Sequence, residues 1–138
     1  MKTTPCVTVK MGEGTRVLAD ARGHQWVADE PKEEGGTDDG PTPKEMLLGA
    51  LGACTAITLR IYAKHKEIPL ESVEVSYELI HGEGRSRPAE SIRARVRIDG
   101  DFDEGQRRRL TQIVGRCPVH RMLEHGVPMD DSVEFAAD

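Results

Sequence analysis

The sequence predicts a single α+β domain with an antiparallel sheet and one long, buried central helix. Three observations support this fold class. Short segments alternate apolar with polar residues, as strands do, and residues 43–67 form one apolar, helix-favouring stretch. The length of 138 residues suits one hydrophobic core. The domain is therefore expected to cover residues 1–138.

The first predicted element is a meander of three short strands over Val7–Val27. Turn sequences that contain glycine, at Gly12–Gly14 and Arg22–Gly23, separate the three segments. The next stretch, Asp29–Thr42, carries three glycines, two prolines and six acidic residues without any periodicity. We expect it to form an exposed and mobile loop between the strands and a helix.

A long helix is predicted to begin at Pro43 and to end near Glu67, before Pro69. Threonine precedes it as a favourable N-cap, and proline is favoured at the first helical position. Between residues 46 and 63 nearly every side chain is apolar or small, and Arg60 carries the only charge. Such a helix needs cover on every side, whereas one small sheet covers one side. We therefore expect a second copy of the chain to cover the other, in a homodimer.

Two strands with one buried face each are predicted at residues 72–79 and 92–98. Apolar residues alternate with acids in the first strand and with arginines in the second. Antiparallel pairing across the Gly82–Pro88 loop would place acids opposite arginines, so the arginine row is interpreted as cross-strand charge pairing. Three more elements follow in order: an amphipathic helix over Asp103–Val114, a short helix from Pro118 to Glu124, and a final strand over Val127–Phe135.

The charge balance excludes several classes of function. The chain has 19 Lys and Arg against 24 Asp and Glu, a net charge of −5, and few aromatic residues, so it offers no basic or base-stacking surface for nucleic acid. The N-terminus lacks an apolar stretch of signal-peptide length, and we expect a cytoplasmic protein. Two glycines, two threonines and an arginine within the long helix disfavour a membrane span.

Cys54 and Cys117 are the strongest candidates for chemistry. In a reducing cytosol the cysteines are expected to be buried, metal-bound or reactive, and Cys6, on an early strand, is assigned no role. Cys117 precedes a helix whose first amides and partial positive charge would stabilise a thiolate. Cys54 lies in mid-helix, so its activation requires a cation from elsewhere, with Arg22 and Arg60 as the candidates.

Two alternatives to redox chemistry remain open. In the first, the cysteines are inert core residues of a small-molecule-binding or scaffold dimer. In the second, Cys117, His120 and His125 bind a metal ion, with Cys54 as a fourth ligand. Neither a zinc signature nor a dinucleotide, P-loop or hydrolase motif is present, so no cofactor and no metal are expected.

Residues Gly40–Cys54 (GPTPKEMLLGALGAC) and Cys117–His120 (CPVH) together resemble the OsmC/Ohr superfamily of thiol-dependent peroxidases. The order of the predicted elements is similar over the whole chain. The resemblance implies an OsmC-like fold and an intertwined homodimer with two active sites at the subunit interface. It implies that Cys54 is the peroxidatic cysteine, which becomes a sulfenic acid, and that Cys117 is the resolving cysteine, which forms a disulfide with it.

The resemblance also extends to an arginine and an acid. Arg22 matches the arginine that polarises the peroxide, and Glu45 corresponds to the acid that orients this arginine. In the organic-hydroperoxide branch that acid stands one position earlier, where this chain has Lys44, and small polar residues stand at the positions of His120 and its neighbour. The chain is therefore more similar to an OsmC-like subgroup.

The substrate implied by the resemblance is an organic hydroperoxide or hydrogen peroxide, and an external dithiol would restore both thiols. An apolar wall on the long helix, with Met46, Leu47 and Leu51 as candidates, would favour organic peroxides over a small hydrated oxidant.

Overall fold

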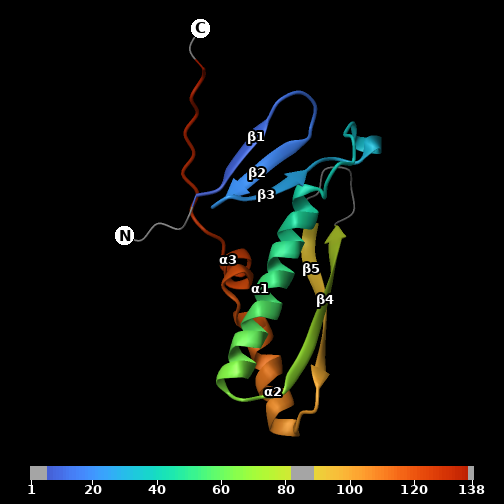
Figure 1. Ribbon diagram of the computed structural model, residues 1–138, viewed down its shortest axis with the longest axis vertical. Coiled ribbons are helices and arrows are strands. Elements are labelled where there is room, and N and C mark those ends of the chain that lie inside the picture. The colour runs from blue at the N-terminus through green and yellow to red at the C-terminus, as the bar shows by residue number, and fades with distance from the viewer. Residues whose placement is uncertain (1–5, 82–88, 137–138) are drawn as a thin grey trace. The chain divides into compact units, whose positions relative to one another are not determined.

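A computed structural model describes residues 6–81 and 89–136 (Figure 1). The predicted fold class is confirmed: the chain is α+β, and its sheets are antiparallel. The chain forms two compact units, residues 1–50 and 51–138, which are described in turn.

The first unit contains the predicted three-stranded meander. Its strands are β1 (Thr8–Met11), β2 (Val17–Ala21) and β3 (His24–Ala28), paired antiparallel in the order β1-β2-β3. β2 and β3 meet at a two-residue turn, Arg22 and Gly23, whose φ angles are +56° and +87°. Positive φ at both positions is typical of the tightest hairpin turns. Arg22 is therefore an exposed residue at the tip of a hairpin.

The loop that follows β3 is more organised than the sequence predicts. It is mostly exposed, as expected, but it contains a 3-10 helix, η1 (Lys32–Glu34), and its first residue, Asp29, is buried. The backbone N–H of Asp29 donates to the carbonyl oxygen of Pro41 at 3.0 Å, which ties the two ends of the loop together. One buried side chain organises the loop, and such an arrangement leaves no periodic signal in a sequence.

Helix α1 spans Pro43–His65, close to the predicted bounds. Its start is a capping box: the Glu45 N–H donates to the Thr42 hydroxyl at 3.2 Å, and the Thr42 N–H donates to the Glu45 carboxylate at 2.8 Å. As an acid in the first turn, Glu45 thus stabilises the start of the helix.

Within the single chain α1 is buried on one side, and the predicted cover of its other side by a second copy stays a prediction. One stripe is buried, whereas the side chains of Ile57 and Ile61 are 58% and 64% exposed. The reason is that the elements of the second unit pack against one side of the helix only. The buried residues lie four positions apart: Leu51, Thr55, Leu59 and Ala63.

The second unit contains both predicted long strands, β4 (Leu70–His81) and β5 (Ala89–Gly100), which pair antiparallel. The Gly82–Pro88 loop predicted between them lies outside the described residues. In the register of the pair the acids of β4 lie opposite the arginines of β5, as the charge pattern predicts: Glu74 opposite Arg97, and Glu78 opposite Arg93.

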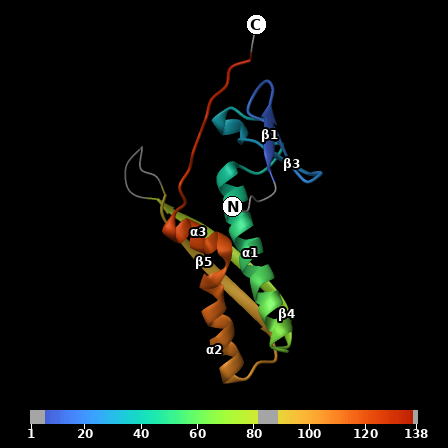
Figure 2. The same cartoon turned by 90° about the vertical axis from the view of Figure 1, so that its left-hand side faces the viewer.

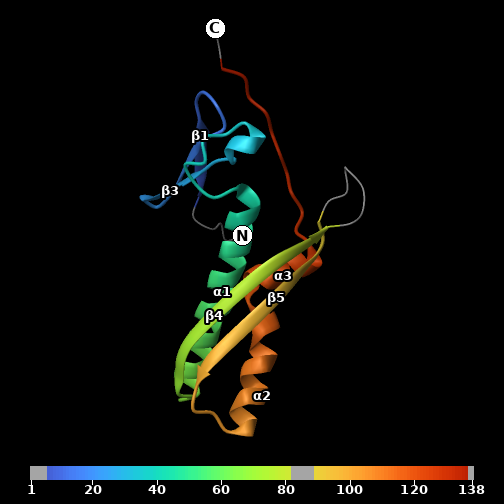
Figure 3. The ribbon, with the colours of Figure 1, turned by 90° about the vertical axis from the view of Figure 1, so that its right-hand side faces the viewer.

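Two more predicted helices, α2 (Glu104–Ile113) and α3 (Pro118–His125), flank a short 3-10 helix, η2 (Val114–Arg116). Figures 2 and 3 show α1 and α2 on the same face of the β4–β5 hairpin. Each fully buried leucine side chain between these elements contributes about 2 kcal/mol through the hydrophobic effect. The core cluster there consists of Leu59, Ala63, Ile68, Leu70 and Leu110.

The predicted final strand over Val127–Phe135 is wrong. Residues 126–136 have no regular secondary structure, and the side chains of Met129, Val133 and Phe135 are 83%, 80% and 88% exposed. The alternation of apolar and polar residues is present, but a strand also needs a neighbouring strand to bond with. Among the strands that the structure describes, none pairs with this segment.

Candidate functional site

Two thiols that are far apart in the sequence meet inside the second unit. Cys54 lies in α1 and Cys117 lies directly before α3, and the two thiols lie near enough for Cys117 to act on the pKa of Cys54. Both cysteines carry free thiols. Cys117 is fully buried, whereas Cys54 is partly exposed. The fold therefore places an accessible sulfur beside a hidden one.

Cys117 is the N-cap of α3. Its Sγ accepts a hydrogen bond from the backbone N–H of His120 at 3.3 Å, and Pro118 occupies the first helical position. From the side of α1, the hydroxyl oxygen of Thr55 lies 3.8 Å from the same sulfur. The sulfur is thus held between two helices.

Burial raises the pKa of the Cys54 thiol, because a thiolate loses the solvation that water provides. The neighbouring Cys117 thiol raises this pKa further. Two hydrogen bonds act in the opposite direction, one from the backbone N–H of Val119 and one from the hydroxyl of Thr58. The net effect raises the pKa of the Cys54 thiol, and a cation beside it would act in the opposite direction.

Arg60 does not supply this cation. Its guanidinium donates to the carbonyl oxygens of Leu70 at 2.7 Å and Glu71 at 3.1 Å, where β4 begins. Arg60 also lies six residues after Cys54, which places the two on different sides of a helix with about 3.6 residues per turn. Arg60 therefore ties α1 to β4.

Arg22 and Glu45 belong to the first unit. Arg22 is exposed in the β2–β3 turn, and Glu45 is exposed in the capping box of α1. Of the four residues predicted for the site, the described second unit brings Cys54 and Cys117 together. The roles of Arg22 and Glu45 stay predictions.

The three residues of the alternative metal site, Cys117, His120 and His125, do not form a metal-binding cluster. Among residues 6–81 and 89–136, no three His, Cys, Asp or Glu side chains lie close enough to hold a metal ion. Both histidines instead face one acid: Nδ1 of His120 lies 3.9 Å from Glu124, and Nε2 of His125 lies 3.4 Å from it. Nδ1 of His120 is buried without a hydrogen-bond partner.

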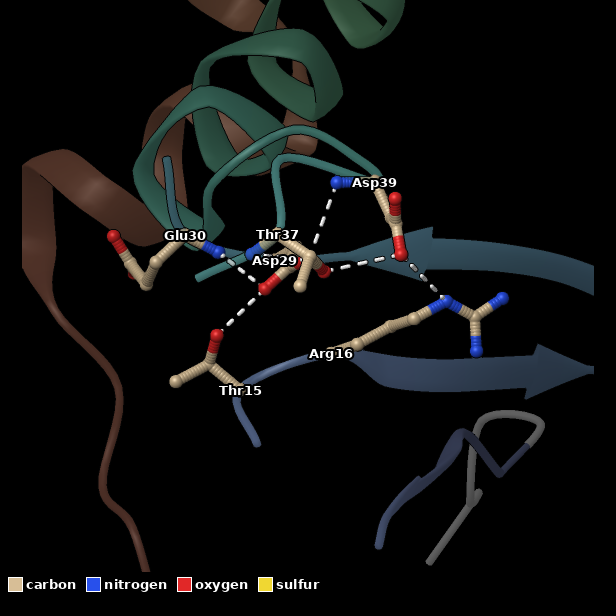
Figure 4. A network of polar contacts seen from close by, with 6 residues as sticks. All are labelled: Thr15, Arg16, Asp29, Glu30, Thr37 and Asp39. Atoms are coloured by element: carbon tan, nitrogen blue, oxygen red, sulfur yellow. Dashed lines mark hydrogen bonds and ion pairs between the residues drawn. The ribbon is translucent and has the colours of Figure 1, made fainter. Parts of the chain in front are cut away.

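Sequence reasoning missed the buried carboxylate of Asp29 in the first unit (Figure 4). It accepts hydrogen bonds from the hydroxyls of Thr15 (2.6 Å) and Thr37 (2.5 Å), and from the backbone N–H groups of Glu30 (2.8 Å), Thr37 (3.3 Å) and Asp39 (3.2 Å). These bonds, that of Thr15 first, hold the pKa of Asp29 far below its ordinary value. The available signal was an acid directly after a strand, at the start of a turn-rich loop.

The chain is similar to one protein family and to several solved structures. The family described as OsmC-like protein matches residues 36–130, a range that includes both cysteines of the site. Comparison with curated proteins gives no match.

Three solved structures illustrate the likeness. An OsmC like protein from Mycoplasma pneumoniae has a TM-score of 0.76 and 21% sequence identity, and the match covers 91% of each chain. An organic hydroperoxide resistance protein from Elizabethkingia anophelis has a TM-score of 0.65 and 18% identity over 91% of each chain. One from Legionella pneumophila has a TM-score of 0.63 and 17% identity, over 88% of this chain and 89% of that one. At these identities the likeness shows the fold.

Proposed function

The chain belongs to the OsmC-like protein family, and from this premise we propose that it is a thiol-dependent peroxidase that reduces organic hydroperoxides. The observation that carries the proposal is the pair of adjacent free thiols, with Cys54 accessible and Cys117 buried. The names of two similar structures, organic hydroperoxide resistance proteins, support the substrate class.

In the proposed reaction the Cys54 thiolate attacks one oxygen of the peroxide. The O–O bond breaks, the other oxygen leaves and takes a proton to form an alcohol, and Cys54 becomes a sulfenic acid. Cys117 then attacks the oxidised sulfur, a disulfide forms, and the sulfenic oxygen leaves as water. An external dithiol, which a reducing cytosol would supply, reduces the disulfide and is itself oxidised.

Arg22 would supply the cation that Cys54 requires. A guanidinium beside Cys54 would favour the thiolate against the effect of burial, and its paired N–H groups would polarise the peroxide. Glu45 would orient this arginine. Both roles come from the resemblance to the family.

A second copy of the chain would cover the exposed apolar side of α1. Ile57 and Ile61 lie on that side, and soluble proteins seldom leave large apolar patches exposed. Among the described residues, α1 is also the one helix long and apolar enough to cross a membrane, a test that core helices of soluble proteins pass as well. Light scattering of the purified chain is expected to give twice the mass of one chain. A monomeric mass, or a need for detergent, would contradict the dimer.

Peroxide consumption with an excess of dithiothreitol is the direct test of the activity. We expect cumene hydroperoxide to be reduced faster than hydrogen peroxide, because an apolar wall would favour the organic peroxide. Of the three residues predicted for this wall, Leu51 is buried at 3% exposure, so Met46 and Leu47 are its accessible members. Equal rates for the two peroxides would remove the argument from an apolar wall.

Three cysteine variants separate the proposed activity from the alternative of an inert binding or scaffold dimer. Cys54→Ser is expected to abolish peroxide consumption, whereas Cys6→Ser is the matched control and keeps it. In Cys117→Ser, the Cys54 sulfenic acid should accumulate and react with dimedone, as mass spectrometry would show. Unmodified Cys54 after peroxide treatment of that variant would refute the peroxidase and favour the inert dimer.

A further inference from the structure

Thr55 is the polar member of the buried stripe on α1. Its neighbours in the stripe are aliphatic, and Thr55 itself is 3% exposed. A buried hydroxyl costs free energy unless it is hydrogen-bonded, and a valine of the same shape would fill the position without that cost. The hydroxyl of Thr55 therefore requires an explanation that packing does not provide.

The contact of this hydroxyl is the sulfur of Cys117, at 3.8 Å. Thr111 in α2 shows the usual alternative for a helical threonine, because its hydroxyl donates to the carbonyl oxygen of Arg107 in its own helix at 2.8 Å. Thr55 instead reaches across to the residue that begins α3. Thr58, one turn of α1 after Cys54, lies near enough to the Cys54 thiol to lower its pKa, so each of the two sulfurs has a threonine hydroxyl in its surroundings.

Two polar groups converge on Cys117 from different elements. One is the hydroxyl of Thr55 in α1, which can donate to the sulfur or accept from its S–H, and the other is the backbone N–H of His120 in α3, which donates at 3.3 Å. A neutral thiol is a weak acceptor, whereas hydrogen bonds to an ionised acceptor are about twice as strong. Both contacts would strengthen if Cys117 ionised during the reaction, and the thiolate is the form that attacks another sulfur.

We propose that Thr55 is a positioning residue for the resolving step, in which its hydroxyl holds the Cys117 sulfur toward Cys54 and donates to it as the thiolate forms. The inference rests on the proposed function in taking Cys117 as the thiol that resolves oxidised Cys54. In that step the Cys117 thiolate attacks the Cys54 sulfur, the S–S bond forms, and the group on Cys54 leaves with its electron pair. When that group is hydroxide, it takes up the proton lost by Cys117 and leaves as water.

The test isolates the resolving step from peroxide. In a Cys6→Ser background, dithiobis(nitrobenzoate) is mixed with the reduced protein in a stopped-flow instrument. Cys54 attacks the reagent and releases one coloured thionitrobenzoate, and Cys117 then attacks the mixed disulfide on Cys54 and releases the second. Cys117→Ser is the control, and it should show the first phase alone.

Thr55→Val is expected to slow the second phase about tenfold, the effect of losing one hydrogen bond to a charged group. The first phase should keep its rate, because Cys54 attacks the reagent in that phase and the contact of the Thr55 hydroxyl is with Cys117. Thr55→Ser keeps the hydroxyl and should keep the rate of the second phase. Thr58→Val is the matched change at the other sulfur, and it should slow the first phase instead.

The Thr55→Ser variant distinguishes hydrogen bonding from packing, because it keeps the hydroxyl that contacts Cys117 and loses the methyl group. A second phase as fast in Thr55→Val as in the wild type would overturn the proposal. A Thr55→Ser variant as slow as Thr55→Val would also overturn it, since the methyl group rather than the hydroxyl would then matter.

The peroxidase proposal can fail separately. A wild-type protein that shows both phases but consumes no peroxide would refute the peroxidase and leave the role of Thr55 supported by the thiol exchange. A wild type without a second phase would overturn the role of Thr55 in resolution.

Discussion

The two units of the chain each bury a polar group, and they treat it differently. In the first unit the carboxylate of Asp29 accepts five hydrogen bonds, none longer than 3.3 Å. In the second unit the Cys117 sulfur has two contacts, at 3.3 and 3.8 Å. The carboxylate is held by donors on both of its oxygens, whereas the buried sulfur is held by fewer and longer contacts.

The pKa shifts follow the same contrast. Donors surround Asp29, so its charged form is favoured and its pKa is lowered. Burial and a second thiol outweigh the two donors at Cys54, so its charged form is disfavoured and its pKa is raised. Hydroxyls and backbone amides donate at both sites, and their number relative to the burial decides whether the pKa of the group is lowered or raised.

The largest expected effect is on activity. Cys117→Ser should reduce steady-state peroxide turnover about a hundredfold, because Cys54 sulfenic acid cannot form the disulfide. Its melting temperature should stay within a few degrees of that of the wild type, since serine keeps an acceptor for the His120 N–H. Turnover with dithiothreitol and thermal unfolding by circular dichroism measure the two quantities. A variant that retains full turnover would show that Cys117 is not the resolving thiol.

Asp29→Asn, unlike Cys117→Ser, should lower the stability of the protein. The amide of asparagine would direct N–H groups at the donors of Thr37 and Asp39, so we expect the melting temperature to fall on the order of 10 °C. Asp38→Asn is the matched control, because Asp38 is exposed and has a φ of +56°, which asparagine tolerates. Equal melting temperatures for the two variants would contradict a structural role for Asp29.

Low pH should reduce the difference in stability between the wild type and Asp29→Asn. The folded-state pKa of Asp29 lies below the ordinary value of 3.8, so its contribution is fully present above the pH at which the unfolded carboxyl titrates. The contribution is lost as the pH falls through the folded-state pKa. The difference in urea unfolding between wild type and Asp29→Asn should therefore be constant from about pH 7 to pH 5 and shrink below pH 4. A difference independent of pH would contradict the lowered pKa.

The smallest expected effect on stability concerns Glu45. This residue caps α1 and is also proposed to orient Arg22. Glu45→Gln keeps a capping box and should leave stability unchanged, whereas Glu45→Ala should cost about 1 kcal/mol. If Glu45 orients Arg22, both variants slow the oxidation of Cys54 by peroxide, which dimedone trapping measures in the Cys117→Ser background. Full activity in Glu45→Gln would leave Glu45 as a helix cap alone.

Much of the fold could be predicted from the sequence, because the signals are local. Thr42 and Pro43 mark the start of α1, and the alternation of residues marks β4 and β5, in whose register acids lie opposite arginines. Cys117 and Pro118 mark the start of α3. The two cysteines of the site also stood out, from their residue type and from the resemblance to a family.

Only the tertiary structure decided which distant residues meet. The burial of Asp29, the one-sided burial of α1 and the absence of a ladder for residues 127–135 among the described strands each depend on segments far apart in the chain. So does the meeting of Cys54 with Cys117, and the contact of Thr55 with the same sulfur. Capping and periodicity act within a few residues, whereas a hydrogen-bond partner for a buried group can come from any segment that the fold brings near.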